Sequence, residues 1–298
     1  MELWRSLARL SRHRNFRKLL AVRVATQASD GTLQVGMASY VLFTPRSQPT
    51  AIAIATVLAI TLLPFSILGP FASILLDRWS RQRVLVITDA VRGLIALALA
   101  ALVWSGDRSA PIQTTMFLLL LVAMSLNRFL LAGLTAGLPY TVDRTEYLTA
   151  SSIMPTIGPL GVLIGGAIAG TIRLLLAPRY MPAHHADAIV FVAAAVLFSV
   201  SVALGFTFGK HELGPEPATH TPTAREVAGD LKDAWSRLSE QGPTWLGLVV
   251  ITAQRFLFGL VMVGTILGFR NYFHTLQQVN AAMADIGVWA AAMGAGFI

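Results

Sequence analysis

Cysteine is absent from the sequence, which excludes disulfide bonds and thiolate metal sites. Charge is also scarce, because only 13% of the residues are charged, against about 25% in soluble domains. A soluble fold of 298 residues needs more polar surface than this. The sequence has no P-loop, nucleophile elbow or metalloprotease helix. We therefore expect neither an ATP-driven machine nor an enzyme, and no cofactor.

Hydrophobic residues make up 55% of the chain and gather in blocks of about 20, the length at which a helix crosses a bilayer core. A helix also satisfies its own backbone hydrogen bonds in lipid. The pattern predicts an all-α membrane protein in contact with the lipid bilayer. Its expected spans are 19–43, 50–76, 84–104, 112–138, 149–176, 186–208 and 246–269, with another starting near 283.

The spans divide the chain into four regions. Residues 1–18 alternate apolar and basic side chains and predict an amphipathic interfacial helix, and 19–208 would form a six-helix bundle. A polar linker follows over 209–245, with an amphipathic helix at 224–238, and 246–298 would begin a second bundle. Because the last residues, GVWAAAMGAGFI, are still apolar, we expect a truncated reading frame or a fragment. Self-association of two such chains would be one way to complete a second half.

The distribution of positive charge predicts an orientation. The net charge of +8 would suit nucleic acid, but the basic residues lie mostly between the spans. With the N-terminus inside, inner segments hold fourteen Lys and Arg and outer segments hold four. Arginine far exceeds lysine, which favours a GC-rich bacterial genome. We therefore expect a multi-pass protein of the bacterial inner membrane, with a cytoplasmic N-terminus and no nucleic-acid partner.

A basic motif closes the second span, and its members are Gly69, Asp77, Arg78, Arg81 and Arg83. Small residues such as Gly69 let two helices approach closely. Asp77 at a helix end can accept hydrogen bonds from arginine. The group could form a latch that stabilises one of two bundle arrangements. The alternative is that the arginines are ordinary anchors on the positive side of the membrane.

This motif resembles the signature between helices 2 and 3 of the major facilitator superfamily, close to its drug and siderophore exporters. Ser73 stands where those exporters usually carry glycine. The resemblance implies two six-helix bundles and proton-coupled efflux, as an antiporter, of small amphipathic compounds by alternating access. The partners would be a small-molecule substrate and protons. The alternative is a transport-inactive fragment or a membrane assembly partner.

Asp30 lies near the middle of the first span, where a charged carboxylate is costly unless it faces a polar interior. This makes Asp30 the candidate for carrying the proton, and similar exporters often have an acidic residue at this place. The alternative is a fixed ion pair with Arg23 or Arg128. Two other charged residues, Asp89 and Arg92, share a helix face in the third span. We expect them to form a charge network, with each other or with the motif after the second span.

Other polar side chains within the spans are candidates to line a cavity or bind substrate: Asn127, Arg128, Gln254 and Arg255. Arg128 could bind an anionic substrate, change the proton affinity of a nearby carboxylate, or extend its guanidinium toward a membrane interface. In the two-bundle arrangement that the resemblance implies, Arg255 would lie at the depth of Asp30 and could pair with it.

Small residues in the fifth span predict a tight helix crossing: Gly158, Gly161, Gly165 and Gly166. Pro159 implies a bend. The segment partly matches a glycine- and proline-containing element in helix 5 of the antiporters of this superfamily, and this resemblance favours export. Four histidines, His13, His211, His220 and His274, are expected to be isolated. His184 and His185 are more readily explained as a solvated loop than as a metal site, and no metal is expected.

Overall fold

The structure, a computed structural model, describes residues 2–42, 52, 79–107, 109–176, 180–214, 229, 233–238, 240–275 and 278–295. Every element in these ranges is helical. The elements are α1 (Glu2–Leu10), α2 (Arg14–Leu42), α5 (Arg81–Trp104), α6 (Ala110–Gly137), η1 (Leu138–Tyr140), α7 (Tyr147–Leu176), α8 (Ala183–Phe206), α10 (Gly242–Leu267), η2 (Gly268–Tyr272) and α11 (Val279–Ala295). An all-α fold is therefore confirmed.

The predicted spans match α2, α5, α6, α7, α8, α10 and α11, and each helix starts a few residues before the predicted span. The helices extend past the apolar segment because their first turns lie where polar side chains are tolerated. The span predicted at 50–76 lies outside the described residues, except for helical Ile52. In the predicted helix at 224–238, the structure describes Gly229 and residues 233–238, all helical.

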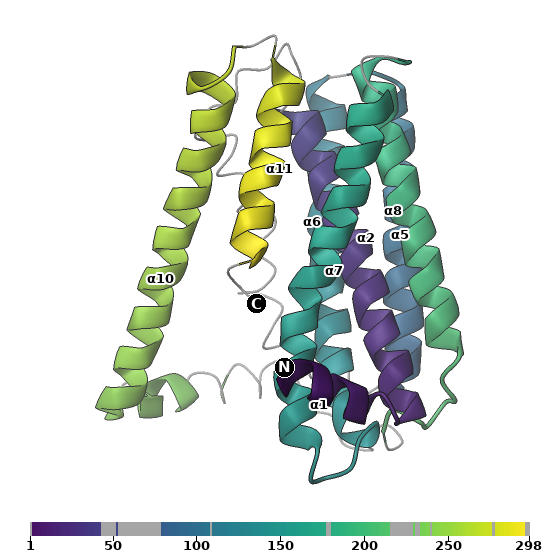
Figure 1. Cartoon of the computed structure of the whole chain (residues 1–298), viewed down its shortest axis with the longest axis vertical. Helices are drawn as coiled ribbons and strands as arrows, with labels where there is room; N and C mark the ends of the chain where they lie inside the picture. The colour runs from purple at the N-terminus through teal and green to yellow at the C-terminus, as the bar shows by residue number, and fades with distance from the viewer. Residues whose placement is uncertain are drawn as a thin grey trace.

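The interfacial helix predicted over 1–18 is wrong in its extent. α1 ends at Leu10, and α2 begins at Arg14 after a turn. In the turn the Ser11 hydroxyl donates to the Ala8 carbonyl at 2.8 Å. The break lets Leu10 and Phe16 reach the same core cluster from two directions. Figure 1 shows α1 lying across one end of the bundle, close to the start of α2.

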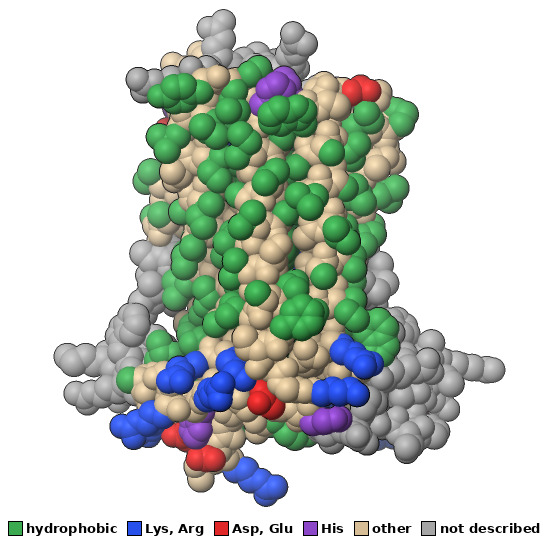
Figure 2. Space-filling view, turned by 90° about the vertical axis from the view of Figure 1, so that its right-hand side faces the viewer, with side chains coloured by type: hydrophobic (Ala, Val, Ile, Leu, Met, Phe, Trp, Pro, Cys, Tyr) green, Lys and Arg blue, Asp and Glu red, His purple; other side chains and the backbone are tan. Residues whose placement is uncertain are grey.

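Five described helices are long and apolar enough to cross a membrane: α5, α6 with η1, α7, α8 and α10. α2 has 29 residues but a more polar sequence, because several of its polar side chains are buried inside the bundle. Hydrophobic side chains cover most of the length of the face in Figure 2, and Lys and Arg gather at one end. The protein is a multi-pass membrane protein.

We call the end where Lys and Arg gather the basic end; it comprises α1, the starts of α2 and α5, residues 138–147 and residues 207–214. Its segments are tied together by side chains. Lys18 Nζ donates to the Thr207 carbonyl at 2.6 Å and lies 3.2 Å from Glu212 Oε2. A hydrogen bond from the Gly209 backbone holds the pKa of Glu212 below its usual range, burial opposes this shift, and Lys18 adds to it. These contacts fasten the start of α2 to the end of α8.

In the part of the chain that the structure describes, five helices form the bundle: α2, α5, α6, α7 and α8. α5 packs on α8 and α6, and α2 packs on α7 and α8. The buried apolar residues form two large clusters, one with Leu33 and Phe198 and the other, toward the basic end, with Leu10 and Leu134. Along α2, α5 and α8, the chain passes from one cluster to the other through a short polar stretch. The bundle therefore contains a polar layer between two apolar ones.

The last two long helices pack differently. None of the residues of α10 is buried, and Figure 1 shows this helix standing apart from the bundle. α11 packs against α7, and Ala282 is fully buried in a small cluster with Ala38 of α2 and Val263 of α10. α11 therefore lies between α10 and the bundle.

Candidate functional site

The candidate site is the polar layer, built by three helices around one arginine. α2 contributes Thr26, Gln27 and Asp30, α5 contributes Asp89 and Arg92, and α8 contributes Ser201. All six residues are buried, and Asp30, Asp89 and Arg92 are 0% exposed. Polar side chains at this depth are held by one another, because neither lipid nor apolar side chains can satisfy them.

Arg92 lies at the centre of the layer and joins two carboxylates. Its guanidinium forms an ion pair with Asp30 and lies 3.0 Å from Asp89 Oδ1. The group also lies over the Phe198 ring, 4.5 Å from its centroid. A planar guanidinium suits this position because it can bind two acceptors in its plane and an aromatic ring on its face.

The second carboxylate, Asp89, accepts a hydrogen bond from a hydroxyl at each of its oxygens. Asp89 Oδ2 accepts from the Ser201 hydroxyl at 2.5 Å, and Oδ1 accepts from Thr26 at 3.0 Å. Thr26 in turn accepts from Arg92 at 3.1 Å. Asp89 is therefore fixed between α2, α5 and α8 by groups that stabilise its charged form.

Asp30 has fewer polar partners than Asp89. Besides its ion pair with Arg92, its Oδ2 accepts from Gln27 Nε2 at 3.0 Å. The partners suggested by the sequence, Arg23 and Arg128, were wrong, because α5 packs close enough to α2 for Arg92 to reach it. Asp89 and Arg92 pair with each other; Gly69, Asp77 and Arg78 lie outside the described residues.

The trio of Asp30, Asp89 and Arg92 has two acidic groups and one basic group. Two carboxylates share one guanidinium, so a fully ionised trio carries a net negative charge in a place without solvent exposure. Arg128 of α6 is close enough to Arg92 for their charges to interact. Such an arrangement can hold one proton on a carboxylate and release it when the neighbouring charges move.

Arg128 and Asn127 lie beside the layer, on α6. Asn127 is buried, and its Oδ1 has no hydrogen-bond partner among the described residues. The charges of Arg128 and Arg23 interact with each other. The Arg23 guanidinium rests against Gly158 of α7, where an added Cβ would lie 2.9 Å from its Nη2.

Gln254 and Arg255 do not join this site. Both side chains are exposed on α10, and the structure does not bring Arg255 to Asp30, which pairs with Arg92. Of the motif after the second span, Arg83 is exposed. Arg81 donates to the Leu213 carbonyl at 2.8 Å and lies 5.0 Å from the Tyr140 ring centroid. Arg81 therefore ties α5 to the other segments of the basic end.

The glycines of α7 form a close crossing with α2. A Cβ at Gly165 would meet the backbone of Ala28, and one at Gly161 would lie 3.0 Å from the Val24 carbonyl oxygen. Gly166 lies at the edge of this crossing, in ordinary contact with Val35. α7 is a single helix that runs through both Pro155 and Pro159. The crossing fixes α2 and its polar side chains against α7.

Sequence reasoning missed a second buried ion pair, in the half of the bundle away from the basic end. Arg173 of α7 lies 2.8 Å from Asp187 of α8. Ser39 of α2 accepts from Arg173 at 3.0 Å and donates to Asp187 at 2.7 Å. The signal was a charged residue inside each of two adjacent spans. The pair joins three helices.

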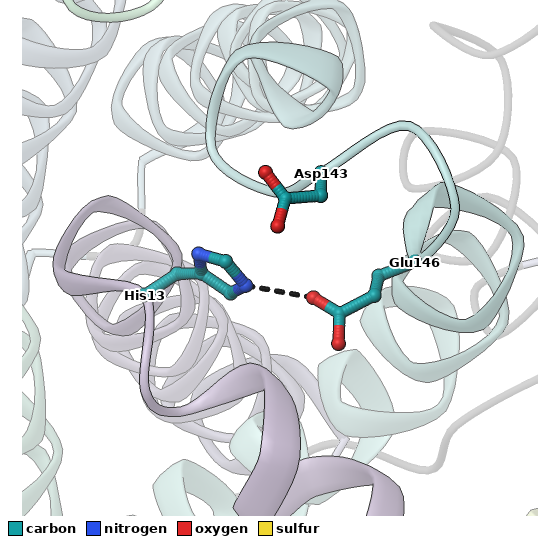
Figure 3. Close-up of side chains that lie close together, drawn as sticks. All are labelled: His13, Asp143 and Glu146. Atoms are coloured by element: carbon teal, nitrogen blue, oxygen red, sulfur yellow. Dashed lines mark hydrogen bonds and ion pairs between the residues drawn. The ribbon is translucent and has the colours of Figure 1, made fainter.

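The prediction that His13 is isolated was wrong. His13 Nε2 lies 2.7 Å from Glu146 Oε2, and the Asp143 carboxylate faces them both (Figure 3). One ligand atom from each residue lies within 4.8 Å of the others. Imidazole and carboxylate groups suit divalent cations. In this structure the pair joins the turn after α1 to the residue before α7.

Comparison with known proteins places these features in context. Residues 20–298 match the sequence model of the Major Facilitator Superfamily. An uncharacterized MFS-type transporter of Mycobacterium bovis is 34% identical over 268 residues, 87% of this chain and 57% of the relative. An uncharacterized MFS-type transporter of Mycobacterium tuberculosis gives the same values. The chain thus spans little more than half the length of these relatives.

Proposed function

The chain belongs to the major facilitator superfamily, and from this premise we propose that it is the N-terminal part of a proton-coupled secondary transporter. The transporter exports small amphipathic compounds in exchange for protons. It works by alternating access, in which two bundles rock around a site near the middle of the membrane. The membrane is a bacterial cytoplasmic membrane, with the basic end inside.

The buried trio of Asp30, Arg92 and Asp89 is the observation that carries the proposal. A buried net negative charge is costly, and uptake of one proton removes it. Asp30 is the carboxylate that takes the proton, because Asp89 already has a hydroxyl donor on each oxygen. Protonation of Asp30 weakens its attraction to Arg92, and this loosens α2 from α5.

The remaining site residues have supporting roles. Arg128 and Asn127 face the substrate from α6, and Gln254 and Arg255 join them once the second bundle closes over the site. Gly69, Asp77 and Arg78 form a latch with Arg81 and Arg83. The contacts of Arg81 with Leu213 and Tyr140 support a latch at the basic end.

The test uses inside-out membrane vesicles that contain the chain as part of the full-length transporter. A pH gradient is imposed, and accumulation of anilinonaphthalene sulfonate and of ethidium is followed by fluorescence. We expect gradient-dependent accumulation of at least one dye, lost in Asp30→Asn. The control Asp107→Asn changes an exposed loop carboxylate and should leave accumulation unchanged.

Two outcomes would change the assignment. Undiminished, gradient-dependent accumulation by Asp30→Asn would remove the proton-carrying role of this residue. A folded wild-type full-length transporter that moves neither dye would instead favour the alternative, a transport-inactive membrane partner. The proton role and the transport activity are thus tested separately.

A further inference from the structure

A small pocket opens between α2, α6, η1 and α7, toward the basic end. The residues that line it include the polar Arg23, Thr135, Tyr147 and Ser151 and the apolar Leu134 and Leu138. The pocket has a volume of about 60 Å³. One water needs only about 10–15 Å³ on the same measure, so the space suits a carboxylate or phosphate group.

Arg23 has a different environment from Arg92, the arginine of the polar layer. Arg92 is paired with two carboxylates, whereas none of the described residues that line the pocket of Arg23 carries a carboxylate. The Nε atom of Arg23 is buried and has no hydrogen-bond partner among the described residues. Its charge interacts with that of Arg128, which repels it. A partly buried cation in this situation lacks, among the described residues, the counter-charge that normally offsets the cost of burial.

The other polar residues of the pocket line the space that a hydrogen-bond acceptor would occupy. Thr135 and Ser151 donate to backbone carbonyls of their own helices, at 2.9 Å in both cases, so they shape the wall. Tyr147 also lines the pocket, and its hydroxyl, which has no such bond in the described part of the chain, can donate to a bound anion. Arginine and a phenol together are a common donor set for oxyanions.

We propose that this pocket binds the anionic group of an amphipathic ligand, with Arg23 as the principal contact. The ligand class is an alkyl phosphate or carboxylate whose apolar part lies along Leu134 and Leu138. This deepens the proposed function and rests on it, because it names the substrate class of the transporter. The same chemistry also occurs in anionic lipid headgroups, so the experiment must separate the two sources.

Gly158 provides a way to disturb Arg23 without removing its charge. An alanine there would place Cβ 2.9 Å from Nη2 and 3.3 Å from Nε of Arg23, and the flexible arginine head can move aside. Gly170 lies farther along the same helix, and an added Cβ meets nothing within 4 Å. Gly158→Ala and Gly170→Ala are therefore a matched pair that separates a shift of Arg23 from a general effect on α7.

Binding is measured on the purified chain in phosphatidylcholine nanodiscs, by titration with dodecyl phosphate, dodecyltrimethylammonium and inorganic phosphate. We expect dodecyl phosphate to bind more tightly than the cation. Arg23→Gln should weaken its binding by about tenfold or more, since a charge-assisted hydrogen bond is lost. Arg17→Gln, an exposed arginine earlier in α2, should bind as the wild type does. Gly158→Ala should weaken binding several-fold, and Gly170→Ala should not.

A second arm adds phosphatidylglycerol to the nanodiscs. Competition with dodecyl phosphate, absent in Arg23→Gln, would identify a lipid headgroup as a ligand; no competition would identify a solute. Equal binding of the anionic and cationic probes, or equal affinity of the Arg23→Gln and Arg17→Gln variants, would overturn the proposal. Because the assay needs no gradient, intact binding without transport would refute the proposed function and leave the anion site standing.

Discussion

Arg92 is a single side chain on which the stability of the polar layer depends. It is fully buried and compensates two carboxylates at once. A buried ion pair adds little net stability over a well-packed apolar core, but removing one partner leaves uncompensated charge. The three residues should therefore behave as a unit, in which single changes cost more than paired ones.

Arg92→Met tests this coupling. We expect it to destabilise the folded chain by about 3–5 kcal/mol, because two carboxylates are then buried without a cation. The double variant Asp30→Asn with Arg92→Met should recover part of this loss. The measurement is thermal or denaturant unfolding in a neutral detergent, followed by tryptophan fluorescence. Arg83→Met, an exposed change at the start of the same helix, serves as control, and an equal loss there would contradict the coupling.

Single residues also show what the sequence could predict. The depth of Asp30 and the shared face of Asp89 and Arg92 follow from spacing along one helix. The pairing of Asp30 with Arg92 does not, because it depends on how closely α2 and α5 pack. The same holds for Arg173 with Asp187 and for His13 with Glu146, whose partners lie 14 and 133 positions apart. Spacing predicts which side chains share a helix face, but packing decides which of them meet.

At the scale of elements, the crossing of α2 and α7 positions the site. Gly165 lies against the Ala28 backbone and its carbonyl accepts from the Thr32 hydroxyl at 3.0 Å. The backbones can approach this closely only because the contact residues lack bulky side chains. Neither backbone can shift as a side chain could, so an added methyl group must separate the helices.

Gly165→Ala should therefore destabilise the bundle, by about 1–3 kcal/mol, the usual cost of overpacking. Gly170→Ala, on the same helix and with open space around it, should be neutral or slightly stabilising. Both variants are compared by unfolding in the same detergent. Equal stability of the two would mean that the crossing is looser than the structure shows.

The contact between His13 and Glu146 fastens the turn after α1 to the start of α7. Glu146→Gln removes the charge on one partner and should release the α1–α2 turn. We expect faster trypsin cleavage at Arg12 and Arg14, measured by mass spectrometry of the purified chain. Glu240→Gln, an exposed glutamate near the start of α10, is the control. Unchanged cleavage in Glu146→Gln would show that apolar contacts alone hold the turn.

Element boundaries were predictable to within a few residues, because apolar length sets where a helix can cross a membrane. The break between α1 and α2 was not, because arginines and apolar residues continue through it at helical spacing. The turn depends on Leu10 and Phe16 meeting in one core cluster, a tertiary contact. The glycines of α7 indicated a close helix crossing, but they did not indicate that α2 is the helix that α7 crosses.

At the scale of the whole molecule, the basic end sets the expected orientation. Exposed basic residues occur at the start of α2 and of α5 and after α8, and the last segment is tied to both starts by Lys18 and Arg81. Positively charged segments are retained on the cytoplasmic side during insertion. All of these segments should therefore lie on the inner side, and the α5–α6 connection on the outer side.

The absence of cysteine makes this orientation directly measurable, since each introduced cysteine is the sole labelling site. Ser11→Cys lies in the turn after α1, Ser236→Cys in the connection before α10, and Ser105→Cys at the far end of α5. In intact cells, a membrane-impermeant maleimide should label only Ser105→Cys; in inside-out vesicles it should label the other two and spare that one. The unsubstituted chain reports background. Labelling of Ser11→Cys and Ser236→Cys from opposite sides would contradict the span parity, and labelling of both from outside would reverse the orientation and place the latch outside.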